Sequence, residues 1–147
     1  PWPFERDLPD TAVPTAADIQ LDNGAIQLAG YDLARTANQL TVDLYWRTQA
    51  VVDDDYGIFV HIGQPDQPPL AQSSAINTER PVYSWRVGEI VHTRHTILLP
   101  DDLDTAVSPD VIVGMYQPDN PNQRIPLTAD GQSAPNASWQ IAPLPQP

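Results

Sequence analysis

Seven arginines, no lysine and nineteen acidic residues give this chain of 147 residues a formal net charge of −12. A negative charge of this size repels phosphate backbones, so nucleic acid is not expected as a partner. The apolar runs are far shorter than the roughly 20 residues of a membrane helix, so this segment is not expected to insert into a membrane. The absence of cysteine excludes disulfide bonds and thiolate zinc sites.

The two ends of the chain are rich in proline and show no sustained apolar period. Residues 1–18, PWPFERDLPDTAVPTAAD, are predicted to form a linker or extended arm, and residues 142–147, APLPQP, a tail of the same kind. Between them, residues 19–141 contain short runs in which apolar and polar residues alternate. This pattern predicts a single β-domain.

The first alternating runs predict a hairpin and a core strand. DIQLDNGAIQLAGYDL holds two runs joined at Asn23-Gly24, a pair that tolerates positive φ at both centres of a type I′ turn. The run QLTVDLYWRTQ follows, and its apolar face is expected to point into the core: Leu40, Val42, Leu44 and Trp46.

The later runs extend the same pattern. YGIFVHIG places Phe59 and His61 opposite its main apolar face, and EIVHTRHTILL places His92 and His95 on opposite faces. VIVGMYQ, RIPL and SWQIA complete the set, and no segment shows a long helical stripe. We therefore predict an all-β, antiparallel β-sandwich, immunoglobulin-like or carbohydrate-module-like, with about seven to nine strands.

Two similar segments, IGQPDQPPL and YQPDNPNQRI, each place Gln-Pro-Asp, an amide residue and proline after a strand. Proline fixes φ and aspartate bonds nearby backbone amides, so both segments are predicted to be loops of strand-turn-strand units.

Three adjacent aspartates, Asp53, Asp54 and Asp55, precede one of the strands. Carboxylate oxygens are the ligands that calcium prefers, so one interpretation is a bound calcium ion. Adjacent carboxylates on an extended chain point in different directions, however, whereas calcium loops space their ligands at alternating positions. The alternative is a solvated loop without any cofactor.

No catalytic residue is assigned. The chain lacks the usual nucleophile, metalloprotease and phosphate-loop motifs. His92 and His95 cannot chelate one metal from opposite faces of a strand, and His61 is interpreted as a packed or hydrogen-bonded residue of the sheet. A hydrolase is accordingly the least favoured function.

The aromatic residues suggest a ligand instead. Trp85 and Tyr83 precede RVGE, just ahead of a strand, and exposed rings at this position would form a surface on which a sugar can stack. The alternative for Trp85 is a plug that closes one end of the sandwich. Trp46 continues an apolar face and is assigned to the core.

The segments IQLAGYDL, LTVDLYWRT, YGIFVHI, RPVYSWRVGEIV, HTILLPDDL and VIVGMYQPDNPNQRIPL together resemble a known module. The module that they resemble is the extracytoplasmic β-sandwich at the C-terminal end of bacterial membrane glycosyltransferases of the dolichyl-phosphate-mannose mannosyltransferase type. The resemblance covers about residues 19–128 and rests on strand patterns. The matching residues are Gly30-Tyr31-Asp32, Trp46, Phe59-Val60-His61, Trp85, Gly88-Glu89 and Gly114-Met115-Tyr116.

The resemblance implies a non-catalytic accessory domain outside the cytoplasm, tethered by upstream membrane helices, with the rest of the parent chain as its partner. Such modules usually have a P-x-G-x-Y turn before the last long strand, whereas this chain has DTAVSPDVIV. A longer turn is therefore expected there, and the register of the following strand stays open. Two functions remain: a structural or interaction module, or a carbohydrate-binding module that uses Trp85 and Tyr83.

Overall fold

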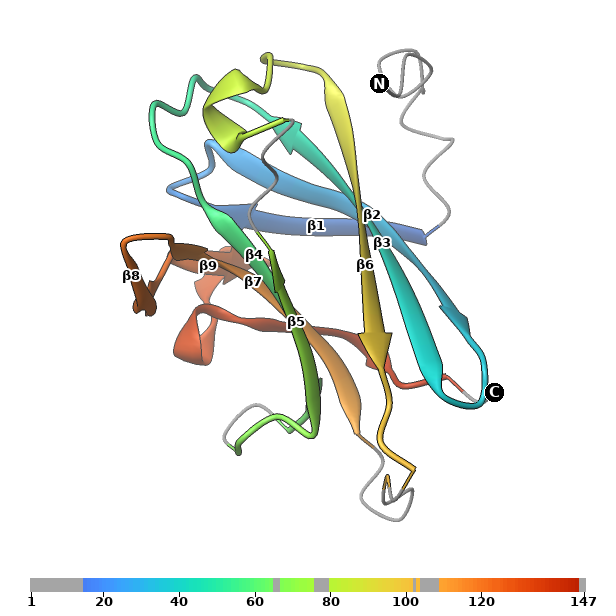
Figure 1. Ribbon diagram of the computed structural model, residues 1–147. Helices are drawn as coiled ribbons and strands as arrows, with labels where there is room; N and C mark the ends of the chain where they lie inside the picture. Colours follow the sequence, from blue (N-terminus) through green and yellow to red (C-terminus); the bar gives the residue numbers. More distant parts are fainter. Residues whose placement is uncertain (1–14, 65–66, 76–79, 102, 104–108, 146–147) are drawn as a thin grey trace.

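The computed structural model describes residues 15–64, 67–75, 80–101, 103 and 109–145, which form two antiparallel sheets packed face to face (Figure 1). The first sheet has the order β10-β9-β1-β2-β3-β6 and the second the order β11-β7-β4-β5, with β8 paired to β7. The prediction of an all-β antiparallel sandwich is confirmed. The eleven strands exceed the predicted number because several, such as β8 and β10, are short.

The strands have the following bounds: β1 Thr15–Leu21, β2 Ile26–Arg35, β3 Gln39–Thr48, β4 Gly57–Gly63, β5 Ala71–Ala75, β6 Ile90–Leu98, β7 Asp110–Gln117, β8 Asn120–Arg124, β9 Leu127–Ala129, β10 Gln132–Ser133 and β11 Trp139–Pro143. Strand β1 begins within the predicted arm, and β11 ends within the predicted tail. Residues 1–14, 146 and 147 lie outside the described residues.

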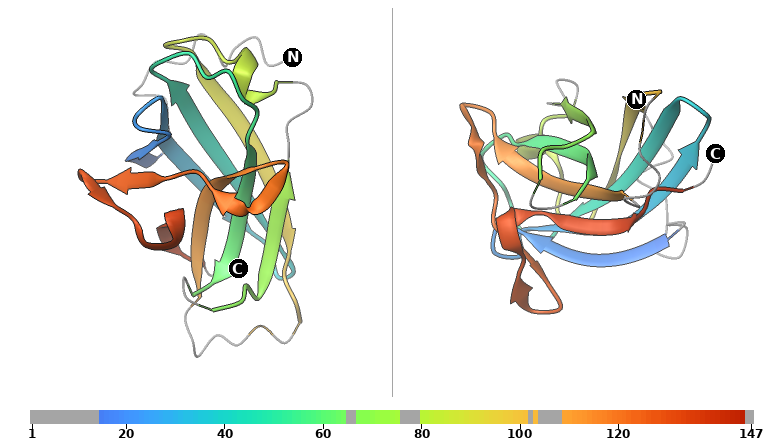
Figure 2. Two further views of the ribbon diagram at one scale, coloured as in Figure 1. Left: turned by 90° about the vertical axis from the view of Figure 1, so that its left-hand side faces the viewer. Right: turned by 90° about the horizontal axis from the view of Figure 1, so that it is seen from below.

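The chain passes between the two layers several times, as the views in Figure 2 show. After β3 it leaves the first sheet to form the β4–β5 pair in the second, and it then returns as β6 beside β3. It crosses again to form β7 beside β4. Pairing of β7 with β4 runs from Gly57↔Tyr116 to Gly63↔Asp110 without a shift, which gives the register that the sequence left open. The turn expected before β7 falls on residues 104–108, outside the described residues.

The core lies between the layers and contains the apolar faces predicted from alternation. The four residues of the β3 face are fully buried, and they meet Ile58, Val60 and Ile62 of β4 in one cluster. Trp46 Nε1 donates a hydrogen bond to Thr93 Oγ1 at 2.9 Å, so the indole N–H is satisfied inside the core.

The predicted hairpin turn joins β1 to β2. Asn23 and Gly24 have φ values of 56° and 89°, and the Ala25 N–H donates to the Asp22 carbonyl at 3.1 Å. Positive φ at both central residues is the feature that the Asn-Gly pair predicts.

Candidate functional site

The outward face of the second sheet carries aromatic and polar side chains. Phe59 and His61 alternate with the core residues of β4, so they point away from the first sheet. Their cross-strand partners on β7 are Gly114 and Ile112. The Phe59 and His61 ring centroids are 4.8 Å apart, with the planes tilted by 43°.

Two glycines make room for two rings on this face. A Cβ at Gly57 would overlap the ring of Tyr116, and a Cβ at Gly114 would overlap the ring of Phe59. A Cβ at Gly114 would also lie 2.9 Å from the carbonyl oxygen of Ala137. Each ring therefore lies over the backbone of the neighbouring strand, close to the sheet.

Arg124, the last residue of β8, reaches over this surface. Its guanidinium carbon lies 4.4 Å from the centroid of the Phe59 ring, a cation–π geometry, and Nη1 donates to the carbonyl oxygen of Asn136 at 2.9 Å. Burial lowers the pKa of Arg124 from its ordinary value. The charge is thus held in place by an aromatic face and a backbone carbonyl.

His61 stands beside Arg124 and shares its environment. Burial, and next the charge of Arg124, lower the pKa of His61 below 6.5. The imidazole is therefore neutral at pH 7, with one nitrogen as a donor and the other as an acceptor. Its cross-strand partner Gln72 on β5 adds an amide to the same surface.

These side chains line a pocket of about 360 Å³, which we call the outer groove: Phe59, His61, Gln72, Tyr116, Pro121 and Arg124. The volume falls within the roughly 300–1,000 Å³ of small-molecule sites. A smaller hollow of about 60 Å³ adjoins it, with His61 and Arg124 on the shared border. Its polar lining includes Gln64, Gln67 and Ser138.

The two proline-containing loops flank this region. As predicted, each belongs to a strand-turn-strand unit, because β4 pairs with β5 and β7 pairs with β8. The first loop contributes Gln67 and Pro69 to the smaller hollow, and the second contributes Pro121 to the outer groove. Residues 65 and 66 of the first loop are outside the described residues.

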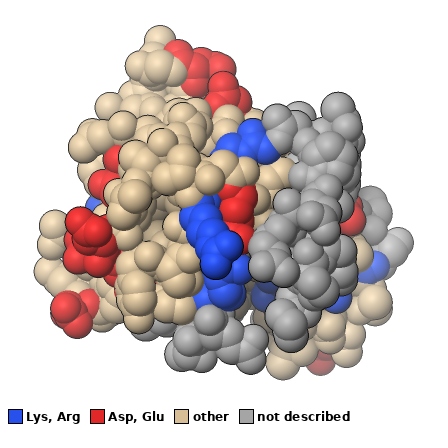
Figure 3. All heavy atoms as spheres, turned by 90° about the horizontal axis from the view of Figure 1, so that it is seen from above, with Lys and Arg blue, Asp and Glu red and all other residues tan. Residues whose placement is uncertain are grey.

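The two aromatic residues predicted from the sequence lie elsewhere. Trp85 is only 5% exposed, its ring centroid is 6.3 Å from that of Trp46, and its Nε1 donates to the Arg80 carbonyl at 2.9 Å. Trp85 therefore lacks the exposed face that a sugar-stacking surface needs, and its position fits the alternative of a plug. Tyr83 is 58% exposed. It belongs to η3 (Val82–Ser84), at an end of the sandwich where basic and acidic side chains intermingle (Figure 3).

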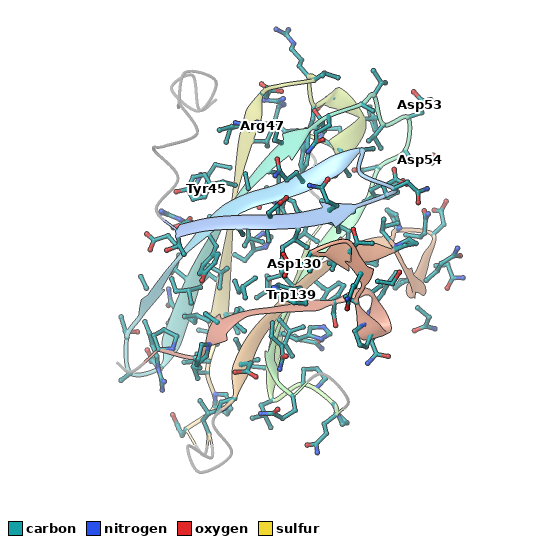
Figure 4. All side chains as sticks on the ribbon, turned by 180° about the vertical axis from the view of Figure 1, so that it is seen from behind. Tyr45, Arg47, Asp53, Asp54, Asp130 and Trp139 are labelled. Atoms are coloured by element: carbon teal, nitrogen blue, oxygen red, sulfur yellow. The ribbon has the colours of Figure 1, made fainter. Side chains whose placement is uncertain are left out.

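The three adjacent aspartates do not converge. Asp53 and Asp54 are exposed at the edge of the molecule (Figure 4), while Asp55 Oδ1 accepts a hydrogen bond from the Val82 N–H at 3.1 Å. Among the described residues, no three histidine or acidic side chains are grouped so that they could hold a metal ion. Asp55 is thus tied to the backbone of η3, whereas a calcium ion at these three aspartates stays a prediction.

The neighbouring Tyr56 anchors this loop to the first hairpin. Its hydroxyl donates to Asp22 Oδ2 at 3.0 Å, and burial together with Asp22 and Asp54 raises the pKa of Tyr56 to about 12.

A second polar cluster lies on the outward face of the first sheet. His92 Nε2 donates to Asp43 Oδ1 at 2.7 Å, Arg94 Nε donates to the same oxygen at 2.8 Å, and the Tyr45 ring stacks on His92. Burial raises the pKa of Asp43, but hydrogen bonds and charges from Arg94 and His92 outweigh it and hold the pKa below its usual value. With the Asp43 carboxylate paired in this way, the cluster is a structural link between β3 and β6.

The histidines occupy the faces that alternation predicts. His92 points outward, whereas His95 is buried in the sandwich at 4% exposure, where its Nε2 lies 2.9 Å from Thr93 Oγ1. Burial lowers the pKa of His95 to about 4. No hydrogen-bond partner for its Nδ1 is found among the described residues.

Sequence reasoning missed Gln72, Tyr116, Pro121 and Arg124 as parts of one site. The signal that could have suggested it is the glycine spacing, because Gly57-x-Phe59 and Gly114-x-Tyr116 each place a glycine and a ring on one face of a strand. Which glycine meets which ring depends on strand pairing, which the sequence does not show.

No protein-family model matches this chain, and the search of curated proteins finds no match either. Within the described residues, no helix is long and apolar enough to cross a lipid bilayer.

Proposed function

We propose that this chain is a non-catalytic accessory module that binds a carbohydrate in the outer groove. The observation that carries the proposal is the lining of the groove, in which the Tyr116 ring stands with three planar polar groups, those of His61, Gln72 and Arg124. Pyranose rings present C–H groups that pack against the negative face of an aromatic ring, and hydroxyl groups at their rim that need donors and acceptors. The groove offers both.

Tyr116 is the stacking residue in this proposal. Its ring is supported from below by the backbone of Gly57, and it remains partly exposed. Phe59 is buried under Arg124, so it serves as the apolar floor on which the guanidinium is fixed. A rigid ring and a fixed guanidinium lose little side-chain entropy when a ligand binds.

The binding role is preferred to hydrolysis because of the groove's chemistry. Glycoside hydrolases use two carboxyl groups on either side of the scissile bond. The described residues that line the outer groove and the smaller hollow include no aspartate or glutamate. A sugar in this groove would therefore be held without an acid and base placed to cleave it.

The resemblance to glycosyltransferase-associated modules extends the proposal to the parent protein. Two matching segments, Phe59-Val60-His61 and Gly114-Met115-Tyr116, lie on the paired strands β4 and β7 and meet where Phe59 pairs with Gly114. In this proposal the module lies on the extracytoplasmic side of a membrane-anchored, glycosyltransferase-like protein and presents the groove to a glycan. Without any glycan ligand, the module would have only a structural role beside the rest of the chain.

Titration calorimetry with a panel of oligosaccharides tests the proposal. We expect saturable binding that falls at least about tenfold in Tyr116→Ala, a loss of roughly 1.4 kcal/mol, while the fold is retained. Tyr83→Ala is the matched control, because it removes an exposed tyrosine outside the groove. Equal binding by both variants, or no saccharide binding by the wild type, would contradict the proposal.

A further inference from the structure

We infer that the sugar bound in the outer groove is acidic, with its anionic group, a carboxylate or a sulfate, bound to the Arg124 guanidinium beside His61. This inference rests on the proposed function and narrows its ligand to one chemical class.

The local charge of the groove favours an anionic ligand. The protein carries a net charge of −12, yet the described residues that line the groove include an arginine and a histidine and no carboxylate. Two arginines outside the groove are paired with acids, Arg94 with Asp43 and Arg80 with Glu89. The groove is thus a basic site on an acidic molecule, and such a local field favours an anionic ligand.

The positive charge of Arg124 is not neutralised by its described neighbours. Within the described part of the chain, its contacts are the Phe59 ring and the Asn136 carbonyl, and neither neutralises its charge. Burial is the cause of its lowered pKa, and no acidic group contributes to the shift. A partly desolvated cation without a counter-ion is costly, and an anion bound in the groove would offset this cost.

The shape and position of the Arg124 guanidinium also suit an anionic group. The guanidinium is planar, presents several N–H donors in a fixed fork, and matches the two oxygens of a carboxylate or sulfate. Arg124 lies on the border between the outer groove and the smaller hollow of about 60 Å³. A sugar stacked on Tyr116 would place a charged substituent at this border, where His61 and the polar lining of the hollow supply further donors.

The test compares acidic oligosaccharides with their uncharged derivatives on the full 147-residue chain. Oligogalacturonates are paired with their methyl esters, so that only the carboxylate differs, and carboxyl-reduced chondroitin sulfate fragments with their desulfated forms, so that only the sulfate differs. At about 50 mM NaCl, where exposed charges are weakly screened, calorimetry should show at least one acidic ligand binding about tenfold more tightly than its uncharged partner. The two pairs distinguish a carboxylate from a sulfate.

Arg124→Gln should lower the affinity for the acidic ligand to that of its uncharged derivative. Arg86→Gln is the matched control, because it removes the same charge from an exposed side chain outside the groove. Arg124→Lys keeps the charge without the fork and should retain part of the preference. Melting temperatures of all variants identify any loss of fold.

The outcomes separate the two proposals. If uncharged saccharides bind as tightly as acidic ones and Arg124→Gln has no effect, the acidic ligand is wrong while the carbohydrate function stands. If Arg86→Gln weakens acidic ligands as much as Arg124→Gln does, the attraction is non-specific and the inference is overturned. If no saccharide binds, the proposed function fails and the inference fails with it.

Discussion

Phe59 of β4 and Gly114 of β7 are cross-strand partners, and the Phe59 ring occupies the space that a side chain at position 114 would need. The ring in turn supports the guanidinium of Arg124. Gly114 therefore determines where the Phe59 ring lies and, through that ring, where the guanidinium of Arg124 is held. Among the described residues that line the groove, Arg124 is the one whose charge does not depend on pH.

Gly114→Ala should destabilise the protein by about 1–3 kcal/mol, because overpacking forces the Phe59 ring and the backbone near Ala137 to move. Urea unfolding measures the loss. The double variant Phe59→Leu/Gly114→Ala should be less destabilised than the sum of its single changes, since a smaller side chain removes part of the overlap. Strict additivity would show that the two positions do not interact in this way.

Trp85→Ala should cost about 3–5 kcal/mol, because it removes a buried ring that packs near Trp46 and leaves the Arg80 carbonyl without the hydrogen bond from the indole N–H. Tyr83→Ala, two positions away on the surface, should change stability by at most about 0.5 kcal/mol. Thermal unfolding of both variants provides the comparison. A Trp85→Ala protein as stable as the wild type would show that the ring is not part of the core.

His95 should make the protein less stable in mild acid. Its pKa is about 4 in the folded protein and 6.5 in an unfolded chain, because burial disfavours the charged imidazole. Above pH 6.5 the residue is neutral in both states. Between the two values the unfolded chain binds a proton that the folded protein does not, so stability falls as the pH falls. At about pH 5 the loss from this residue should be about 2 kcal/mol.

Urea unfolding at about pH 7 and about pH 5 tests this effect in the wild type and in His95→Leu, which should lose less stability on acidification. His61→Gln is the companion variant, because the lowered pKa of His61 contributes to the same loss on acidification, and this variant measures that share. Asp43 does not interfere in this range, since its lowered pKa affects stability only below about 3.8. Equal losses in the wild type and His95→Leu would refute the assignment.

Alternation in the sequence was sufficient to predict the faces of β3, β4 and β6. A strand has a period of two, and burial selects one face, so Trp46 and His95 were assigned to one side of their strands and His92 to the other. The same logic predicted that Phe59 and His61 point away from the main core face. The Asn23-Gly24 turn was predictable because few residue pairs tolerate positive φ twice.

The outer groove was not predictable because its members come from strands that meet only in the folded sheet. Phe59 and Gly114 are neighbours through the pairing of β4 with β7, and Arg124 arrives on β8 by a further pairing. The burial of Trp85 could not be predicted from the sequence either, because irregular segments have no period from which burial can be inferred. The hydrogen bond from the Val82 N–H to Asp55 could not be predicted either, because it joins a loop to η3, 27 residues further along the chain.

A titration of the ¹⁵N-labelled chain with the oligosaccharide panel, followed by amide chemical shifts, tests the carbohydrate site most directly. We predict that the saturable shift changes centre on the residues of the outer groove, with Phe59, His61, Gln72, Tyr116 and Arg124 among them. Amides around Tyr83 should stay unchanged. Changes centred on Tyr83, or no saturable change with any saccharide, would contradict the account.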